Sequence, residues 1–374
     1  MEFATGGHLE VRITPDDVGK RVSVRSLTGP DEPKAAFTDT VGVLTSWTGG
    51  TLRITRRDGR TVALREAALV AGKPVPAAPA RRRGVPAASV RELQWVAARG
   101  WPAVETERLG EWTLRASPVA VRGPVRGEAS VRGPVRRAGF TSRANSVLPL
   151  GDPGLPLDAA LRHVQDWYAE RGLPAKVQVA TGHEGAHELL AARLDERGWT
   201  ADRHTLMRTG ALAPLADRAP DTRVRVHRRL DADWLRAYGR AEEAEDETAP
   251  RVLSGGPSVW FATVPGEGEA PGEGGPRGEG EAHGEGGPPV PAAIGRCVVD
   301  GRWAGFAAIE VAPAYRRQGF ARAVMAELAR TALAEGASAA YLQVEADNDA
   351  ARALYDGLGF ADHHAYHYRT APRV

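Results

Sequence analysis

The chain has 374 residues, of which 42% are hydrophobic and 26% charged, so wholesale disorder is excluded and two or three domains are expected. It has no apolar run near the ~18 residues that a membrane span needs and no secretory signal at its start, so we expect a cytoplasmic protein with no membrane partner. A formal net charge of +2 gives no sign of nucleic-acid binding, and a single cysteine, Cys297, excludes an internal disulfide and a cysteine-rich metal site.

Residues 1–76 are predicted to form a small all-β domain. Four apolar or β-branched runs predict short strands at 22–25, 41–47, 52–57 and 61–64. Asp58-Gly59, between two of these runs, is a typical two-residue hairpin turn. The pattern resembles an SH3-like barrel. Such a domain could stabilise its neighbour or bind a protein partner, and the sequence leaves both roles open.

A linker is expected at 77–88, followed by a mixed α/β region at 89–213. Within that region we expect helices at 90–99, 157–170 and 187–197, and strands at 112–116, 141–148, 176–180 and 204–209. Ser89 can cap the first helix. The motif VRGPVR occurs at both 121–126 and 131–136, which predicts a flexible basic insertion at 119–138 between paired strands.

The last predicted domain, 222–374, contains a segment at 265–291 rich in Gly, Pro and Glu that is predicted to be a disordered hairpin tip. After it, strands are expected at 294–300 and 303–311, joined by the tight turn Asp300-Gly301. A loop at 312–320 leads into a helix that ends at Gly336, and further strands are expected at 340–344 and 360–369.

The loop before the long helix is a candidate anion site. The first N–H groups of a helix lack intrahelical partners, and the helix dipole makes this end electropositive. Gly319 allows close approach of the backbone, and Arg316 and Arg317 add positive charge. Neither a Walker sequence nor G-x-G-x-x-G is present, so these features predict a pyrophosphate without naming the nucleotide.

Two motifs resemble those of the GNAT superfamily of N-acetyltransferases. Arg316-x-x-Gly319-x-Ala321 resembles its [R/Q]-x-x-G-x-[G/A] motif, and the stretch from Asn348 through Tyr355 to Gly359-Phe360 resembles its N-x-x-A-x-x-L-Y-x-x-x-G-F ending. The resemblance extends over about 224–369. It implies an α/β fold with a mixed sheet whose central parallel strands splay apart.

The resemblance also implies roles for particular residues, with acetyl-CoA as acetyl donor. Its pyrophosphate would lie on the amides of Arg316, Arg317, Gln318, Gly319, Phe320 and Ala321. An amine would attack the thioester directly in a ternary complex, the backbone N–H of Val311 would hold the developing oxyanion, and Asn348 would hold the pantetheine arm or a water. Tyr355 matches the position that protonates the departing thiolate.

The base that deprotonates the amine is not specified by the motifs. Glu310 and Glu345 end the two central strands and are the candidates, although ordinary strand-end carboxylates are an equal alternative. His363, His364 and His367 alternate along a strand, which puts His364 on the opposite face from the other two, so we expect no metal site. The acidic run 242–247 could attract a cationic amine or could simply be a solvated helix face.

Residues 89–213 are similar in strand and helix order to a GNAT half, which suggests a tandem arrangement. This half lacks the R-x-x-G-x-G motif, and Pro153 removes an N–H from its closest equivalent, so we expect a degenerate half that shapes the acceptor cleft. The alternative to an N-acetyltransferase is a catalytically silent acyl-CoA sensor or scaffold that uses the barrel to bind a protein or nucleic acid. The acceptor amine, on a small molecule or a protein, stays open.

Overall fold

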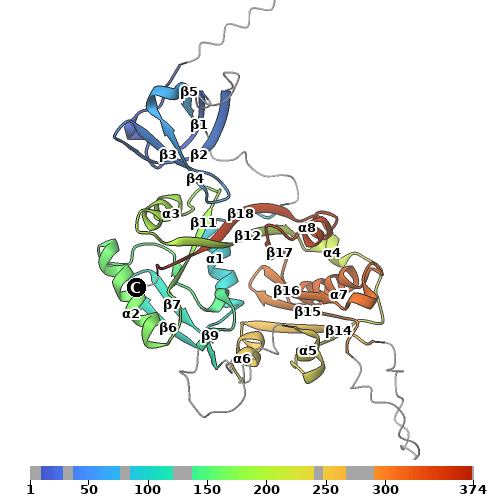
Figure 1. Ribbon diagram of the computed structural model, residues 1–374. Coiled ribbons are helices and arrows are strands. Elements are labelled where there is room, and N and C mark those ends of the chain that lie inside the picture. Colours follow the sequence, from blue (N-terminus) through green and yellow to red (C-terminus); the bar gives the residue numbers. More distant parts are fainter. Residues whose placement is uncertain are drawn as a thin grey trace, which may run out of the picture.

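The structure is a computed structural model, and it describes residues 10–27, 37–75, 85–120, 137–239, 247–266 and 290–372 (Figure 1). Most of the predicted linker, basic insertion, Gly/Pro/Glu loop and acidic run lie outside these ranges. The strands flanking two of these segments do pair. β8 (Pro118–Ala120) runs antiparallel to β9 (Arg137–Gly139), and β14 (Ser258–Val264) to β15 (Ala293–Asp300).

The N-terminal sheet consists of five antiparallel strands in the order β4-β3-β2-β1-β5. Their bounds are β1 Arg21–Leu27, β2 Phe37–Thr48, β3 Thr51–Thr55, β4 Thr61–Arg65 and β5 Leu69–Pro74. Alternating side chains such as Val22, Val24 and Ile54 form a small buried core. No pairing joins β4 to β5 among the described residues, so the predicted SH3-like barrel is not confirmed and no closed barrel is found.

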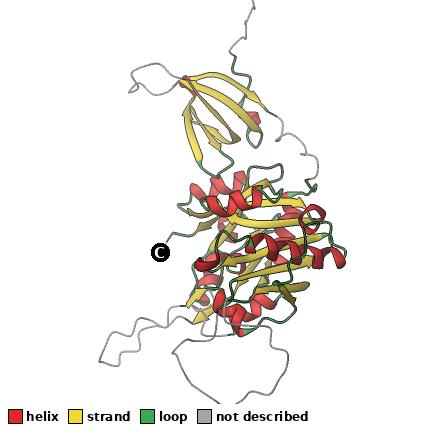
Figure 2. Ribbon diagram, turned by 90° about the vertical axis from the view of Figure 1, so that its right-hand side faces the viewer, coloured by secondary structure: helices red, strands yellow, loops and turns green. Residues whose placement is uncertain are grey.

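The remaining described residues, from 85 onward, form what we call the body (Figure 2). Its helices are α1 Val90–Arg99, α2 Leu157–Glu170, α3 Glu188–Asp195, α4 Ala213–Ala216, α5 Ala232–Ala237, α6 Thr248–Ser254, α7 Phe320–Ala334 and α8 Asp349–Asp356. Its further strands are β6 Glu105–Leu109, β7 Trp112–Ala116, β10 Leu148–Pro149, β11 Lys176–Thr181, β12 Thr200–Ala211, β13 Arg225–His227, β16 Trp303–Val311, β17 Ala339–Glu345 and β18 Ala361–Thr370.

One sheet of eight strands runs through both parts of the body in the order β11-β18-β12-β17-β16-β15-β14-β13. The last strand of the chain, β18, lies between β11 and β12, while β12 lies between β18 and β17. Each predicted half thus contributes its last strand to the middle of the other half. The boundary expected between 213 and 222 separates two chain segments, but it does not divide the sheet.

The same order of elements occurs twice along the body. A parallel bridge joins Val147 to Val177 in the first half, and β16 runs parallel to β17 in the second. The strand expected at 141–148 was wrong in part, because Ser142–Ala144 form a 3₁₀ turn. The Thr141 side chain caps that turn by accepting a hydrogen bond from the Arg143 N–H, so only a two-residue strand remains, at Leu148–Pro149.

Helices cover both faces of the sheet in the second half, and successive side chains of β15 point alternately to these two faces. Cys297 and Val299 pack with α4 and α7, whereas Ile294 and Val298 pack with α5 and α6. Cys297 is fully buried. Among the described residues, no helix has the length and apolar character needed to cross a membrane.

A chain of buried side-chain hydrogen bonds crosses the junction between the halves. The Arg115 guanidinium donates to Gln178 (2.9 Å), the Gln178 amide donates to Gln94, and the Gln94 amide reaches His364 Nε2 (2.7 Å). His364 and His363 meet at their Nδ1 atoms, 2.8 Å apart. The expectation that they lie on opposite faces is therefore wrong, because β18 has a register shift that leaves His363 outside the regular alternation.

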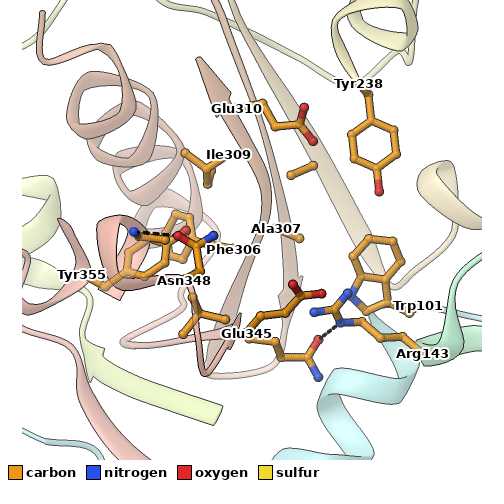
Figure 3. Close-up of a pocket in the computed structure, with 14 residues that line it drawn as sticks. Trp101, Arg143, Tyr238, Phe306, Ala307, Ile309, Glu310, Glu345, Asn348 and Tyr355 are labelled. Atoms are coloured by element: carbon orange, nitrogen blue, oxygen red, sulfur yellow. Dashed lines mark hydrogen bonds between the residues drawn. The ribbon is translucent and has the colours of Figure 1, made fainter. Parts of the chain in front are cut away.

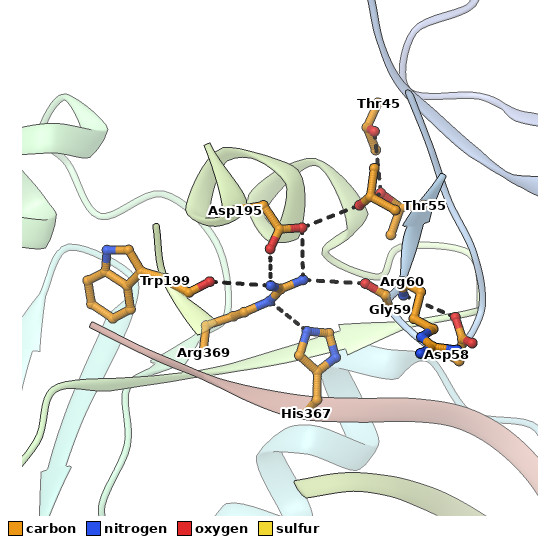
Figure 4. A network of polar contacts seen from close by, with 10 residues as sticks. Thr45, Thr55, Asp58, Gly59, Arg60, Asp195, Trp199, His367 and Arg369 are labelled. Carbon is orange, nitrogen blue, oxygen red and sulfur yellow. Dashed lines mark hydrogen bonds and ion pairs between the residues drawn. The ribbon is translucent and has the colours of Figure 1, made fainter. Parts of the chain in front are cut away.

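The N-terminal sheet contacts the body through its β3–β4 hairpin (Figure 4). The buried Arg369 guanidinium pairs with Asp195 and donates to the Gly59 carbonyl (3.3 Å). The Thr181 hydroxyl donates to the Arg57 carbonyl (2.7 Å). At Gly59, whose φ is 80°, a Cβ would lie 2.4 Å from the His367 ring, so only glycine fits at this contact.

Candidate active site

The two central parallel strands part as predicted. β16 and β17 pair only from Trp303–Ala339 to Phe306–Leu342, and beyond that point both continue without pairing to each other. A bulge on β16 accompanies the separation: its register against β15 shifts between Ile294 and Arg296, and Ala308 has a φ of 50°. A bulge bends its strand and increases local twist, which opens the gap between the strands.

A pocket of about 220 Å³ occupies this gap (Figure 3). Both halves of the body line it, with side chains from α1's C-terminal flank, the 3₁₀ turn, α5's end, β16, β17 and α8. The lining residues are Trp101, Arg143, Tyr238, Phe306, Ala307, Ala308, Ile309, Glu310, Gln343, Val344, Glu345, Asn348, Ala351 and Tyr355. The first half therefore shapes the pocket that the second half's strands create.

The loop that follows β16 offers a row of unbonded backbone amides, which we call the amide loop (317–321). The Arg316 N–H bonds to the Pro313 carbonyl (3.3 Å), and the N–H groups of Arg322 and Ala323 both bond to the Gly319 carbonyl (3.0 and 3.1 Å). Between them, the amides of 317–321 have no acceptor within the part of the chain that the structure describes. They lie at the N-terminus of α7, where the helix dipole is positive.

Backbone conformation at the amide loop is unusual. Gly319 has a φ of 85°, and a Cβ added there would meet no atom within 4 Å, so the backbone borders open space. Arg317 has a φ of 65°, which is rare for a residue with a side chain. Strain of this kind concentrates at functional sites. A diphosphate would fit such a cradle, and the exposed side chains of Arg316 and Arg317 lie beside it.

The other residues predicted to contact the cofactor lie in or next to this loop, and several of their side chains already have partners within the protein. The Gln318 amide donates to the Ala314 carbonyl (3.3 Å), and Arg316 Nε donates to the Val311 carbonyl (3.4 Å). The Phe320 side chain belongs to the core, and Phe320 and Ala321 are the first two residues of α7.

Val311 ends β16 at the edge of the gap. The Ala312 N–H bonds across to the Ala292 carbonyl (3.0 Å), and since successive amides alternate in direction, the Val311 N–H points toward the gap. Val311 nevertheless does not line the pocket, to which β16 contributes Phe306 to Glu310. The bulged backbone at 307–309 is thus nearer the pocket than Val311.

Tyr355 lies in the pocket with its ring edge-on to Phe360 (6.0 Å between centroids). Its hydroxyl has no hydrogen-bond partner among the described residues. Burial raises the pKa of Tyr355 to about 12, although the positive charge of Arg208 opposes the shift. The phenol is therefore protonated throughout the ordinary pH range and can donate a hydrogen bond into the pocket.

The predicted polar residues Glu310, Glu345 and Asn348 also come together in the pocket. Glu345 lies 3.7 Å from Arg203, a residue whose φ is 51°. The Asn348 side chain caps α8 by accepting a hydrogen bond from the Ala351 N–H (3.0 Å), which leaves its amide NH₂ for another partner. Asn348 thus has a local structural role in addition to any contact with a ligand.

Sequence reasoning missed the pocket residues Trp101, Arg143, Tyr238 and Gln343. Only Gln343 carried a signal, since it is a polar residue within a strand of otherwise apolar character. Trp101 and Arg143 come from the first half, more than 150 residues before the motifs, and nothing in their local sequence points to the pocket.

One protein family and several solved structures are similar to this chain. The family described as "Probable histone acetyltransferase Rv0428c C-terminal" matches residues 119–369. A GCN5-related N-acetyltransferase from Kribbella flavida is similar over 76% of this chain and 96% of its own length, with 16% identity and a TM-score of 0.46. A tandem GNAT protein from the clavulanic acid biosynthesis pathway is similar over 58% of this chain and 70% of its own length, with 12% identity and a TM-score of 0.42.

A search of curated proteins gives no match to this chain. The family match covers well over half of the 374 residues, including parts of both halves of the body, the amide loop and the pocket residues except Trp101. The chain belongs to the family described as "Probable histone acetyltransferase Rv0428c C-terminal".

Proposed function

We propose that this protein is a GNAT-type N-acetyltransferase that transfers the acetyl group of acetyl-CoA to a primary amine by direct attack. The observation that carries the proposal is the amide loop, which opens beside two parted parallel strands whose gap contains Tyr355 and two carboxylates. Bound there, acetyl-CoA would supply an activated acetyl group next to the pocket.

The residues present fit such a cofactor. The unbonded amides of 317–321 could bind a diphosphate, and the absence of a side chain at Gly319 leaves room for it. The unpaired edges of β16 and β17 beyond Phe306 and Leu342 could accept the amide groups of a pantetheine arm. The Asn348 side-chain oxygen caps α8, so its NH₂ is left to donate to the same arm, and Figure 3 shows Asn348 beside Tyr355.

The reaction also requires a proton to leave the ammonium group of the acceptor and a proton to reach the departing thiolate. An alkylammonium has a pKa near 10.4, so a carboxylate must remove its proton at neutral pH, and Glu310 and Glu345 are the candidates. Backbone N–H groups of the bulge or of Val311 would stabilise negative charge on the thioester oxygen.

Tyr355 would interact with the sulfur atom of the departing CoA. An ordinary thiol has a pKa near 8.5, so complete proton transfer from a phenol of pKa about 12 is unfavourable by about 5 kcal/mol. Burial therefore makes Tyr355 a weaker acid than a free tyrosine, whose pKa is near 10. We infer that Tyr355 stabilises the departing thiolate mainly as a hydrogen-bond donor, and that the proton finally taken up by sulfur is the second one released by the attacking nitrogen.

Replacing Tyr355 with phenylalanine is expected to lower kcat about 10- to 100-fold, since it removes only the hydroxyl. Because the pKa of Tyr355 is raised to about 12, the loss should be constant between pH 7 and 10. The rate of thiol release, measured with an amine panel across this range, checks both points. An alkaline fall near pH 10 that is present in the parent and absent from Tyr355→Phe would contradict them.

The same experiment separates the enzyme from a silent acyl-CoA sensor. A sensor would be stabilised thermally by acetyl-CoA yet would show no Tyr355-dependent release of thiol.

The role of the N-terminal sheet as a binding site for a protein partner is likewise a proposal, tested by comparing the amine panel with and without residues 1–76. The cytoplasm, where a buried free cysteine such as Cys297 stays reduced, is the location we propose.

A further inference from the structure

The pocket contains one cation that no carboxylate neutralises. Arg143 lines the pocket from the first half of the body and is only partly exposed. Its Nε donates to the Gln343 side chain (2.8 Å), and its guanidinium lies 5.5 Å from the centre of the Trp101 ring. Among the described residues, no carboxylate lies within ion-pair distance of it. The side chain that accepts the Arg143 hydrogen bond, Gln343, is neutral.

The surroundings of Arg143 hold it in this position. Trp101 covers one face of the guanidinium, and the buried hydroxyls of Tyr366 and Tyr368 interact with it electrostatically from the side of the sheet. These neighbours are neutral. A guanidinium carries five N–H donors, and the contacts of Arg143 with Gln343 and the Tyr366 hydroxyl leave others for further partners. An incompletely paired cation at a pocket wall is a favourable partner for an anion that enters the pocket.

Opposite charges line the same small space. Figure 3 shows Glu310 at one side of the pocket and Arg143 at another, with Glu345 drawn beside Arg143 in this view. Carboxylates attract an ammonium group, and the guanidinium attracts a carboxylate, so the pocket matches a molecule that carries both charges. At about 220 Å³, it is smaller than the ~300–1,000 Å³ sites that enclose drug-sized ligands, so the group that it encloses is small.

We propose that the acceptor is a small amino acid or related zwitterion, whose carboxylate pairs with Arg143 while its amine faces the carboxylates and the parted strands. This inference rests on the proposed acetyl transfer and adds the class of acceptor. Arg143 is then the residue that determines specificity, because it distinguishes acceptors with a carboxylate from those without one. A lysine side chain in a peptide has no such anion near its amine.

The balance of the transfer is simple. The ammonium of the amino acid loses a proton to a pocket carboxylate, and its nitrogen forms a bond to the acetyl carbonyl carbon as the carbon–sulfur bond breaks. The electron pair of that bond goes to sulfur, and the nitrogen, once bonded to the carbonyl carbon, releases its second proton, which the sulfur takes up. The products are an N-acetyl amino acid and free CoA, with no oxidant or reductant required.

The test uses pairs of acceptors that differ only in the carboxylate. Glycine, β-alanine, 4-aminobutyrate and the standard α-amino acids are compared with their primary amides, and a lysine-containing peptide is included. We expect the full chain to prefer at least one acid over its amide by 10-fold or more in kcat/KM. Arg143→Gln should remove that preference, because it should slow the acid 10- to 100-fold more than the amide.

Arg171→Gln is the matched control, since Arg171 also stacks on a tryptophan (3.7 Å from the Trp167 ring) but lies in the first half with Glu105 as its ion-pair partner. It should leave the acid preference intact. Equal rates for acids and amides, or a preference for the peptide, would overturn the inference while leaving the acetyltransferase proposal standing. Failure of acetyl-CoA to bind or to release thiol with any amine would instead defeat the proposed function, and this inference with it.

Discussion

Replacing Gly319 with glutamate is expected to weaken acetyl-CoA binding at least 1,000-fold. The new side chain would project from a backbone with a φ of 85° into the open space that the amide loop borders. It would block several hydrogen bonds from N–H groups to a charged ligand, each worth about 1.5–3 kcal/mol, and would place a negative charge against the diphosphate. Isothermal titration of the folded variant with acetyl-CoA measures the loss directly.

Gly336 provides a matched control at the other end of the same helix. Its φ is 93° and a Cβ there also meets no atom within 4 Å, so Gly336→Glu imposes similar backbone strain, about 1–2 kcal/mol, away from the loop. That variant should bind acetyl-CoA as the parent does. Unchanged affinity in folded Gly319→Glu would show that the amide loop does not hold the cofactor.

A second large effect is expected from mild acid, which should strongly destabilise the protein. Burial lowers the pKa of His187 to about 4, that of His367 to about 3, and that of His364 well below its ordinary 6.5. Below pH 6.5 the unfolded chain therefore binds protons that the folded chain does not. The stabilisation is complete above pH 6.5, and below that pH the free energy of unfolding should fall by about 1.4 kcal/mol per pH unit for each of these histidines, down to about pH 4 for His187 and about pH 3 for His367.

The hydrogen bonds of these histidines explain why the folded protein resists protonation. In each, one ring nitrogen serves as an acceptor: for the Ala180 N–H at His187, for the Gln94 amide at His364, and for Arg369 Nε at His367. A proton on that nitrogen would break the bond. At His367 it would also place a second positive charge against the buried guanidinium that joins the body to the N-terminal sheet (Figure 4).

Urea denaturation at pH 7.5, 6.5 and 5.5 measures this effect. Since a typical domain has only about 5–15 kcal/mol of stability, a loss near 4 kcal/mol by pH 5.5 is easily seen. His187→Asn should reduce the slope by about a third. Equal free energies of unfolding at pH 7.5 and 5.5 would disprove the account.

Local patterns were sufficient to predict most elements of the body. The Ser89 cap and Gly100 delimit α1, and the Ser89 Oγ accepts a hydrogen bond from the Glu92 N–H (3.0 Å) as expected. The bounds predicted for α2, Leu157–Glu170, and for β7, Trp112–Ala116, agree with the structure. The parting of β16 and β17 was also anticipated, but only through the resemblance of the motif that follows them.

The acceptor end of the site could not be predicted in the same way. Arg143 and Trp101 reach the pocket because the first half folds against the second, a contact between residues far apart in sequence. The raised pKa of Tyr355 also depends on tertiary burial, which changes it from a matched acid to a hydrogen-bond donor. The amide loop was predictable because a glycine and the N-terminus of a helix expose backbone N–H groups through short-range geometry alone.

By itself, the amino-acid sequence determined which segments are strands and helices, since alternation, caps and turn residues act within a few positions along the chain. The tertiary structure alone decided which strands are neighbours. β18 carries the same alternating pattern whether it borders β12 alone or lies between β11 and β12, because a strand's edges offer identical backbone groups to any partner. The exchange of strands between halves, the residues that complete the pocket, and the contact of Arg369 with the N-terminal sheet all follow from that choice of neighbours.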